Sequence, residues 1–247
     1  MKDRVVLLTG GSRGIGSATV RALHACGSSV LFTFANREDE AALLCAELGD
    51  RVGAVRCDLA RSETLPAVVD ECLRRFGRID VLVNNAGIFE YNPFFGTDYA
   101  AWIAGWQRTF AVNLFGTANI TWLVLQQMRK RGSGKIINIA SRSAHRGELD
   151  FADYGSSKAA MVNLTKSIAR SCAPYGIVSI AIAPGFIETE MAAEELENRR
   201  AEIEAEIPAR RIGSAQEVAS IVTFFAGPAG DYANGATIDV NGGSYVR

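Results

Sequence analysis

The sequence is poor in histidine and carries no surplus of charge of either sign. It contains two histidines, His24 and His145, and its formal net charge is −1. A zinc site needs several histidine or cysteine ligands at short spacing, so the scarcity of histidine argues against a metal centre. A nucleic-acid-binding protein needs a basic excess to pair with phosphates, and the balanced charge argues against that class as well.

Long apolar runs and paired cysteines are also missing. No run approaches the length of a membrane span, and the N-terminus lacks the apolar stretch and small-residue cleavage site of a signal peptide. An odd number of widely spaced thiols without a CxxC pair is typical of reduced, cytosolic proteins. The five cysteines are Cys26, Cys45, Cys57, Cys72 and Cys172. We therefore expect a cytoplasmic protein that binds neither membranes nor nucleic acid.

Hydrophobic residues make up 48% of the 247 residues, enough to bury a sizeable core. Short β-branched runs alternate with helical patterns, and no linker or low-complexity segment interrupts them. Most of these runs are continuously apolar, which indicates strands covered on both faces. The expected strands are 5–9, 29–34, 52–57, 79–84, 135–140, 178–183 and 237–240. The alternation predicts one α/β domain, 1–247, with a parallel, doubly wound sheet and helices on both faces.

The expected helices stand between these strands. The first begins near residue 14, and others are expected over 39–48, 62–76, 99–113, 114–131 and 154–172. Two more helical segments precede the last strand. Residues 190–210, within an expected substrate lid over 187–212, are rich in glutamate and arginine, which we interpret as a mobile helical cover over the site.

A glycine-rich turn joins the first strand to the first helix, with glycines at positions 10, 11, 14 and 16. Glycine lets the backbone turn tightly and approach a pyrophosphate, and the helix N-terminus adds unpaired N–H donors. The spacing is Gly-x-x-x-Gly-x-Gly, which differs from the general Gly-x-Gly-x-x-Gly fingerprint. Its position at the first strand of a βαβ pattern predicts a dinucleotide site.

The same turn has a rival interpretation. Gly10, Ser12 and Gly14 also form Gly-x-Ser-x-Gly, the nucleophile elbow of α/β-hydrolases. That elbow normally follows several strands, and its histidine comes late in the chain after an acidic residue. Neither His24 nor His145 fits that order, so we disfavour a serine hydrolase.

The end of the second strand indicates which dinucleotide binds. An acidic residue about 20 positions past the glycines normally holds the ribose 2′-hydroxyl of NAD. Here the strand ends with Asn36 and Arg37, and Arg13 lies in the glycine turn. Two guanidinium groups near the ribose favour a 2′-phosphate, so we predict NADP(H) over NAD(H). The alternative is that Arg37 is an ordinary solvated surface residue.

A serine, a tyrosine and a lysine form the candidate catalytic set. Tyr154 and Lys158 are four positions apart and share one side of a helix. Ser141 lies at the C-terminal end of the fifth strand, where such sheets bind ligands. Reduction of a carbonyl by hydride transfer needs a proton donor, and a nearby lysine cation and an oxidised nicotinamide favour the phenolate. Ser141 can hydrogen-bond the carbonyl oxygen and orient it.

With these residues in order, the chain resembles the short-chain dehydrogenases/reductases over essentially its whole length. The matching pieces are Thr9-Gly10-x-x-x-Gly14-x-Gly16, Asp58-Leu59, Asn84-Asn85-Ala86-Gly87, Asn113, Ser141, Tyr154-x-x-x-Lys158 and Pro184-Gly185. The resemblance implies a single Rossmann-type domain with seven parallel strands. It also implies an oxidoreductase that uses NADP to interconvert a carbonyl and an alcohol.

The resemblance assigns roles to the catalytic set Asn113, Ser141, Tyr154 and Lys158. Tyr154 is the implied general acid/base, Lys158 lowers its pKa and holds the nicotinamide ribose, and Asn113 holds a water that links Lys158 to solvent. The expected cofactor-binding residues are Gly10, Ser12, Arg13, Gly14, Ile15, Gly16, Asn36, Arg37, Asp58, Leu59, Asn85, Ala86, Gly87, Tyr154, Lys158, Pro184, Gly185, Ile187 and Thr189. Structural alternatives remain: Asn113 merely interrupts a helix, and Asp58 caps the next one.

The C-terminal third resembles 3-oxoacyl-[acyl-carrier-protein] reductases in particular. The segments that carry this likeness are 184–191, 207–213 and 240–243. It implies a homotetramer and a carrier-bound acyl chain as a candidate substrate. Arg129, Lys130 and Arg131 are a candidate docking patch for an acidic carrier protein, or cations that suit a helix C-terminus.

Two segments depart from those reductases. Arg142, His145, Arg146 and Glu148 follow the catalytic serine, and they either recognise a polar or acidic substrate, pair with one another, or face a second subunit. Residues 89–106 are rich in aromatic side chains, which either wall a bulky substrate or pack a helix and a subunit contact. The alternatives to a carbonyl reductase are a dehydrogenase of a sugar, polyol, steroid or other small alcohol, and a non-catalytic NADP(H) redox sensor. The substrate and the direction of reaction stay open.

Overall fold

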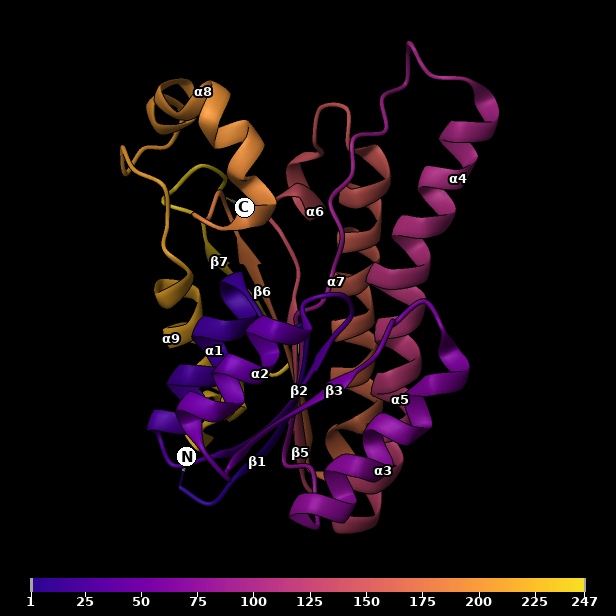
Figure 1. The fold of residues 1–247 in the computed structure, drawn as a ribbon, viewed down its shortest axis with the longest axis vertical. Helices are drawn as coiled ribbons and strands as arrows, with labels where there is room; N and C mark the ends of the chain where they lie inside the picture. Colours follow the sequence, from indigo (N-terminus) through magenta and orange to yellow (C-terminus); the bar gives the residue numbers. More distant parts are fainter. Residues whose placement is uncertain (1, 247) are drawn as a thin grey trace.

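The computed structural model describes residues 2–246, apart from the side chain of residue 194. Within these residues seven strands form one parallel sheet in the order β3-β2-β1-β4-β5-β6-β7 (Figure 1). The strands are β1 Val5–Thr9, β2 Ser29–Phe34, β3 Val52–Arg56, β4 Val81–Asn84, β5 Gly134–Ile139, β6 Ile177–Pro184 and β7 Thr237–Val240. The predicted seven-stranded, doubly wound sheet is confirmed.

Helices cover both faces of this sheet. Helices α1, α2 and α9 lie on one face and α3, α4, α5 and α7 on the other, while α6 and α8 lie beyond the carboxyl ends of the strands (Figure 1). The α-helices are α1 Gly14–Ala25, α2 Glu38–Leu48, α3 Leu65–Phe76, α4 Tyr99–Phe110, α5 Thr117–Arg131, α6 Ser143–Arg146, α7 Ala152–Cys172, α8 Ala193–Glu206 and α9 Ala215–Ala226. Short 3-10 turns are η1 Ser62–Thr64, η3 Ala173–Tyr175, η4 Glu190–Ala192 and η5 Pro228–Ala233, and η2 Ala111–Gly116 is a π-helix.

Strand β1 shows why the apolar runs predicted a doubly covered sheet. Val6 and Leu8 pack into the core cluster beneath α1 and α9, whereas Val5 and Leu7 pack into the cluster beneath α3 and α5. Successive side chains of a strand point to opposite faces, so a strand with a core on each side needs an apolar residue at every position. Transfer of this apolar surface out of water is the main force that holds the two helical layers to the sheet.

The order of the strands reverses between β1 and β4. After β3 the chain crosses back and enters β4 beside β1, where Thr9 and Asn84 are register partners at the carboxyl ends. The connections that leave these two strands run to opposite sides, so a crevice opens between them. Such a switch point is where parallel α/β sheets bind ligands.

A buried ladder of polar side chains ties α5 and α7 to the middle of the sheet. Asn84 Nδ2 donates to Asn138 Oδ1 at 2.8 Å and to Thr121 Oγ1 at 2.9 Å. Asn138 Nδ2 in turn donates to Thr165 Oγ1 on α7 at 2.8 Å. Buried polar groups are stable only when paired, so the ladder fixes the position of α7 relative to β4 and β5.

The predicted helix boundaries are correct to within a few residues, with two differences of kind. The helix expected over 62–76 begins with the 3-10 turn η1, and α3 starts beside Pro66, which suits the first turn of a helix. The two helices expected over 99–131 are joined by the π-helix η2, which contains Asn113. A π-helix inside a longer helix often marks a functional site.

The polar ladder leads to a prediction about stability. We expect Asn138→Ala to lower the free energy of unfolding by about 2–4 kcal/mol, because it removes the buried hydrogen bonds that Asn138 makes with Asn84 and Thr165. Urea denaturation measures the change, and Thr165→Ser, which keeps the hydroxyl, is the matched control. A loss for Asn138→Ala no larger than that of the control would contradict a structural role for the ladder.

Candidate active site

A cavity of about 670 Å³ runs along the carboxyl ends of the strands. Its walls come from the glycine turn after β1, the ends of β2, β4 and β5, the start of α7, and the segment that follows β6. Every residue predicted to bind the cofactor lines this cavity, including Asn36, Asp58, Leu59 and Ile187. Asn113 is the one predicted site residue that lies behind the wall.

The glycine turn has the close backbone approaches that require glycine. Gly10 has φ 72°, and a Cβ there would lie 2.9 Å from Cα of Ala86. A Cβ on Gly16 would overlap the carbonyl oxygen of Gly10. Asn85 Nδ2 donates to that oxygen at 2.7 Å, so its side chain holds the turn against β4. The turn leaves an open cradle before the first turn of α1, which fits a pyrophosphate.

Two arginines meet at the end of the cavity beside β2. Arg13 Nη1 lies 2.7 Å and Arg37 Nη2 lies 3.2 Å from the same atom, Oε2 of Glu190. Arg37 also binds Glu40 at 3.0 Å. The arginines, mainly Arg13, lower the pKa of the Glu190 carboxyl, which is therefore ionised at neutral pH. The two guanidinium groups thus converge on one anionic oxygen.

Ser141, Tyr154 and Lys158 come together at the other end of the cavity. Ser141 follows β5, and the other two lie on the first turns of α7. Lys158 Nζ donates to the carbonyl of Ile139 at 2.8 Å and lies 5.7 Å from the centre of the Tyr154 ring. The Tyr154 and Ser141 side chains both line this end of the cavity. The spacing of the sequence motif therefore brings all three groups to one place.

The pKa values of this pair are set mainly by burial. Burial raises the pKa of Tyr154 to about 12, against the opposing effect of the Ser141 hydroxyl. Burial also lowers the pKa of Lys158 to about 8. The lowered phenol pKa that the sequence led us to expect is therefore not supplied by the protein alone, because desolvation disfavours the phenolate.

Asn113 connects the π-helix to the loop after β4. Its Oδ1 accepts from the backbone N–H of Ile88 at 2.8 Å, and its Nδ2 donates to the Ile88 carbonyl at 3.0 Å. A Cβ on Gly87 would lie 3.2 Å from Asn113 Oδ1 and 3.4 Å from Lys158 Nζ. Gly87 therefore leaves open the space between these two side chains.

The sequence reasoning missed a relay of hydrogen bonds behind Ser141. Ser141 Oγ donates to Ser143 Oγ at 3.0 Å, and Ser143 Oγ donates to Glu148 Oε2 at 2.6 Å. Glu148 also pairs with Arg146 at 3.4 Å. A serine two positions past Ser141 was the only signal in the sequence, and it has no meaning until α6 folds back over the site.

Aromatic rings pack against Tyr154. Phe89 meets the Tyr154 ring edge-on at 4.8 Å and stacks on Phe151 at 3.8 Å. Farther along the aromatic segment, rings of Trp102 and Trp106 continue along α4 with centroids 5.4 Å apart. Phe89 at the start of the segment thus lines the cavity, and the tryptophans at its end pack along α4.

Arg142 has an unusual environment beside Ser141. Its side chain is buried, lines the cavity and lies over the Phe186 ring at 4.6 Å. Its guanidinium makes no hydrogen bond to the described residues and no ion pair within 4 Å. Burial lowers the pKa of Arg142, as does Arg146, while carboxylates at Glu148, Glu195 and Glu206 oppose the shift. Arg142 is therefore a buried cation in the wall of the cavity.

The serine hydrolase hypothesis finds no geometric support. Ser12 lies on the turn after the first strand, and His24 is hydrogen-bonded to Arg51 at 3.1 Å. His145 stacks beside Tyr245 at 5.9 Å, near the C-terminal end of the described chain. Within residues 2–246 no histidine is placed to take a proton from Ser12.

Comparison with known proteins agrees with this geometry. The profile of the family described as Enoyl-(Acyl carrier protein) reductase matches residues 10–245. A short-chain dehydrogenase/reductase of Brucella melitensis, described as a glucose/ribitol dehydrogenase, is 33% identical, covers 100% of this chain and 98% of its own, and superimposes with a TM-score of 0.92. The chain belongs to the short-chain dehydrogenase/reductase family.

Other members of the family are similar over the whole length. The 3-oxoacyl-[acyl-carrier-protein] reductase of Vibrio cholerae is 35% identical over 100% of this chain and 99% of its own. The acetoacetyl-CoA reductase of Shinella zoogloeoides is 38% identical over 98% of this chain and 99% of its own. A blue fluorescent protein from a metagenomic library, solved in complex with NADPH, is 33% identical, covers 99% of each chain and superimposes with a TM-score of 0.91.

The burial of Lys158 predicts its titration in this short-chain dehydrogenase/reductase. In the protein without cofactor, we expect the ammonium of Lys158 to lose its proton as pH rises through about 8, well below the ordinary 10.5. NMR of isotope-labelled lysine side chains measures the pKa, and Lys158→Met assigns the signal by removing it. A transition near 10.5 would show that the ammonium is solvated, against the buried position described above.

Proposed function

We propose that this protein is an NADP(H)-dependent oxidoreductase that interconverts a carbonyl compound and an alcohol by hydride transfer. The observation that carries the proposal is the arrangement of one cavity. It has a glycine cradle and two converging arginines at one end, and Ser141, Tyr154 and Lys158 at the other. This order suits a dinucleotide laid along the strand ends with its nicotinamide beside the tyrosine.

The chain's own residues supply the proton and orient the substrate. When bound, the dinucleotide supplies the hydride and, in its oxidised form, a positive ring that favours the phenolate. In reduction, the Tyr154 hydroxyl gives its proton to the oxygen of the substrate as negative charge develops there. Its high pKa keeps the phenol protonated at neutral pH, which suits this direction. Ser141 turns its hydroxyl proton from Ser143 to the same oxygen, and Lys158 stabilises the phenolate that remains.

The preference for NADP(H) rests on Arg13 and Arg37. Their shared contact with one carboxylate oxygen supports a site that accepts an anion at the ribose end of the cavity. No acidic side chain takes the usual NAD position at the end of β2, where Asn36 stands. Among solved relatives, the blue fluorescent protein was solved in complex with NADPH. A 3-ketoacyl-(acyl-carrier-protein) reductase of Brucella melitensis, 26% identical, was solved in complex with NADH.

A 3-oxoacyl thioester is the first candidate substrate. Two curated relatives are named for the reduction of 3-oxoacyl-carrier and acetoacetyl-CoA compounds. A carrier-bound chain then implies a carrier protein as partner. The basic end of α5 is only partly available to it, because Arg129 lies over Tyr175 at 4.8 Å and Arg131 pairs with Asp80 at 3.3 Å.

A small polar or acidic carbonyl compound is the second candidate substrate. Arg142 favours it, because a buried guanidinium without a hydrogen bond is costly unless a ligand pairs with it. The same residue has no evident use for a neutral acyl chain. A dehydrogenase of a small alcohol or sugar, the alternative left open by the sequence, belongs to this second class.

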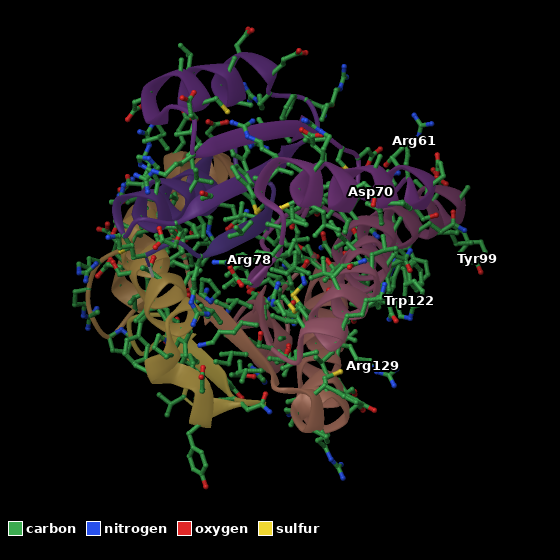
Figure 2. All side chains as sticks on the ribbon, turned by 90° about the horizontal axis from the view of Figure 1, so that it is seen from below. Arg61, Asp70, Arg78, Tyr99, Trp122 and Arg129 are labelled. Carbon is green, nitrogen blue, oxygen red and sulfur yellow. The ribbon has the colours of Figure 1, made fainter. Side chains whose placement is uncertain are left out.

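A homotetramer is the proposed assembly, and the cytoplasm the proposed location. Tyr99, Phe115 and Trp122 stand exposed on the outer side of α4, η2 and α5, and Figure 2 shows Tyr99 and Trp122 pointing away from the body of the protein. Exposed aromatic residues in such numbers are typical of a subunit contact. Within residues 2–246, no helix has both the length and the hydropathy to cross a bilayer.

Replacement of the catalytic tyrosine separates an enzyme from a redox sensor. We expect Tyr154→Phe to lower kcat/KM for carbonyl reduction by about 10²–10⁴-fold, because the proton donor is lost. NADPH binding should persist, since the ring and its contact with Phe89 remain. NADPH consumption and NADPH fluorescence measure the two effects. Near-normal turnover of the variant, or binding of NADPH without turnover of any carbonyl by the wild type, would contradict this proposal.

Replacement of Arg142 separates the two substrate classes. If the substrate is a small oxo acid, Arg142→Met should lower kcat/KM for the acid by about 10–100-fold and leave its uncharged ester unaffected. The panel compares 3-oxoacyl thioesters with oxo acids, sugars, polyols and their neutral analogues. A wild-type preference for thioesters that Arg142→Met does not change would eliminate the second class.

A further inference from the structure

One carboxylate of the chain already occupies the anion site at the ribose end of the cavity. Glu190 opens the turn η4, directly after Thr189 and before α8. Thr189 packs on the glycine turn, since a Cβ on Gly14 would lie 3.3 Å from Thr189 Cγ2. This packing holds the segment across the cavity and brings Glu190 over Arg13 and Arg37.

The contact of Glu190 resembles the one that a phosphate oxygen would make. Its Oε2 receives hydrogen bonds from Arg13 at 2.7 Å and from Arg37 at 3.2 Å. The donors come from two separate elements, the glycine turn and the end of β2, and both line the cavity with Glu190. A carboxylate and a phosphate are recognised by guanidinium groups through the same geometry. The two anions therefore exclude each other from this place.

We propose that Glu190 is an internal competitor of the 2′-phosphate and so sets how strongly the protein prefers NADP(H) over NAD(H). The inference rests on the proposed use of NADP(H) at this site. The 2′-phosphate binds Arg13 and Arg37 only after it displaces the Glu190 carboxylate. A dinucleotide without that phosphate leaves the Glu190 contacts in place. Glu190 therefore weakens the binding of NADP(H) and leaves NAD(H) unaffected.

The exposure of the three side chains limits the size of the effect. About half of each side chain remains accessible, 46% for Arg13, 48% for Arg37 and 54% for Glu190. Exposed ion pairs are weak, and salt screens them. Displacement is thus easy, and the competition tunes the affinity without blocking the site. Glu40, which also pairs with Arg37, does not line the cavity.

The test compares dissociation constants of NADPH and NADH for the wild type and three variants at one low ionic strength. Glu190→Gln keeps the shape of the side chain and removes its charge. We expect it to lower the dissociation constant of NADPH by roughly 3- to 10-fold and to leave that of NADH unchanged. Glu188→Gln is the matched control, because it removes the same charge from the same segment, where Glu188 pairs with Arg200 at 2.5 Å and does not line the cavity. It should leave both constants unchanged.

Arg37→Ala distinguishes failure of this inference from failure of the proposed cofactor preference. We expect it to raise the dissociation constant of NADPH by about 10-fold or more and that of NADH only slightly. If Arg37→Ala raises the dissociation constant of NADPH but Glu190→Gln leaves it unchanged, the competition by Glu190 is refuted and the proposed preference for NADP(H) stands. The inference is also refuted if Glu190→Gln lowers the dissociation constants of both dinucleotides equally, or if Glu188→Gln lowers that of NADPH as much as Glu190→Gln does. Either result would show an effect of overall charge. If Arg37→Ala has no selective effect, the cofactor preference and the inference both fail.

Discussion

The parallel register of the sheet is the constraint on which the site depends. Because all strands run the same way, the ends of β1, β2, β4, β5 and β6 meet at one edge, and the order of the strands reverses between β1 and β4. Side chains from segments as far apart as Gly10 and Thr189 therefore line one cavity, because the register of the sheet places these segments at the same edge. The buried ladder from Asn84 to Thr165 adds the fixed position of α7. The chemistry of the family needs that precision, since hydride transfer depends on close approach of the reacting atoms.

Burial shifts the pKa values of Tyr154 and Lys158 and at the same time lowers the stability of the fold. The pKa of Lys158 falls to about 8, so the folded protein binds fewer protons than the unfolded chain between about pH 8 and the ordinary 10.5. Stability contributed through this group accordingly rises with pH across that window, and at lower pH the buried cation destabilises the fold. Arg142 adds a second buried cation with no hydrogen bond to the described residues. Destabilising buried charges of this kind concentrate at functional sites, where they are retained for binding or catalysis.

The sequence predicted the parts of the structure that local patterns determine. Continuous apolar runs predicted the strands, because both faces of each strand are covered, and the glycine spacing predicted the turn that approaches β4. The four-residue spacing of Tyr154 and Lys158 placed them on one side of α7. These signals lie within a few residues of one another, so the secondary structure alone brings them together.

Features that join distant segments could not be predicted in the same way. The contact of Glu190 with Arg13 and Arg37 spans more than half of the chain and depends on how the segment after β6 folds back. The relay from Ser141 to Glu148 depends on the short helix α6, and the π-helix at Asn113 replaces the expected break between two helices. The phenol pKa was expected to be lowered by the lysine together with an oxidised nicotinamide, whereas in the protein alone burial raises the pKa of Tyr154.

The central claim is that one dinucleotide lies along the strand ends, with its phosphate-bearing ribose at the arginines and its nicotinamide at the tyrosine. A crystal structure of the protein grown with NADP⁺ tests it most directly. The account predicts the 2′-phosphate between Arg13 and Arg37, Glu190 withdrawn from them, and the nicotinamide ring beside Tyr154 and Lys158. A dinucleotide bound outside this cavity, or bound within it with the nicotinamide remote from Tyr154, would contradict the account.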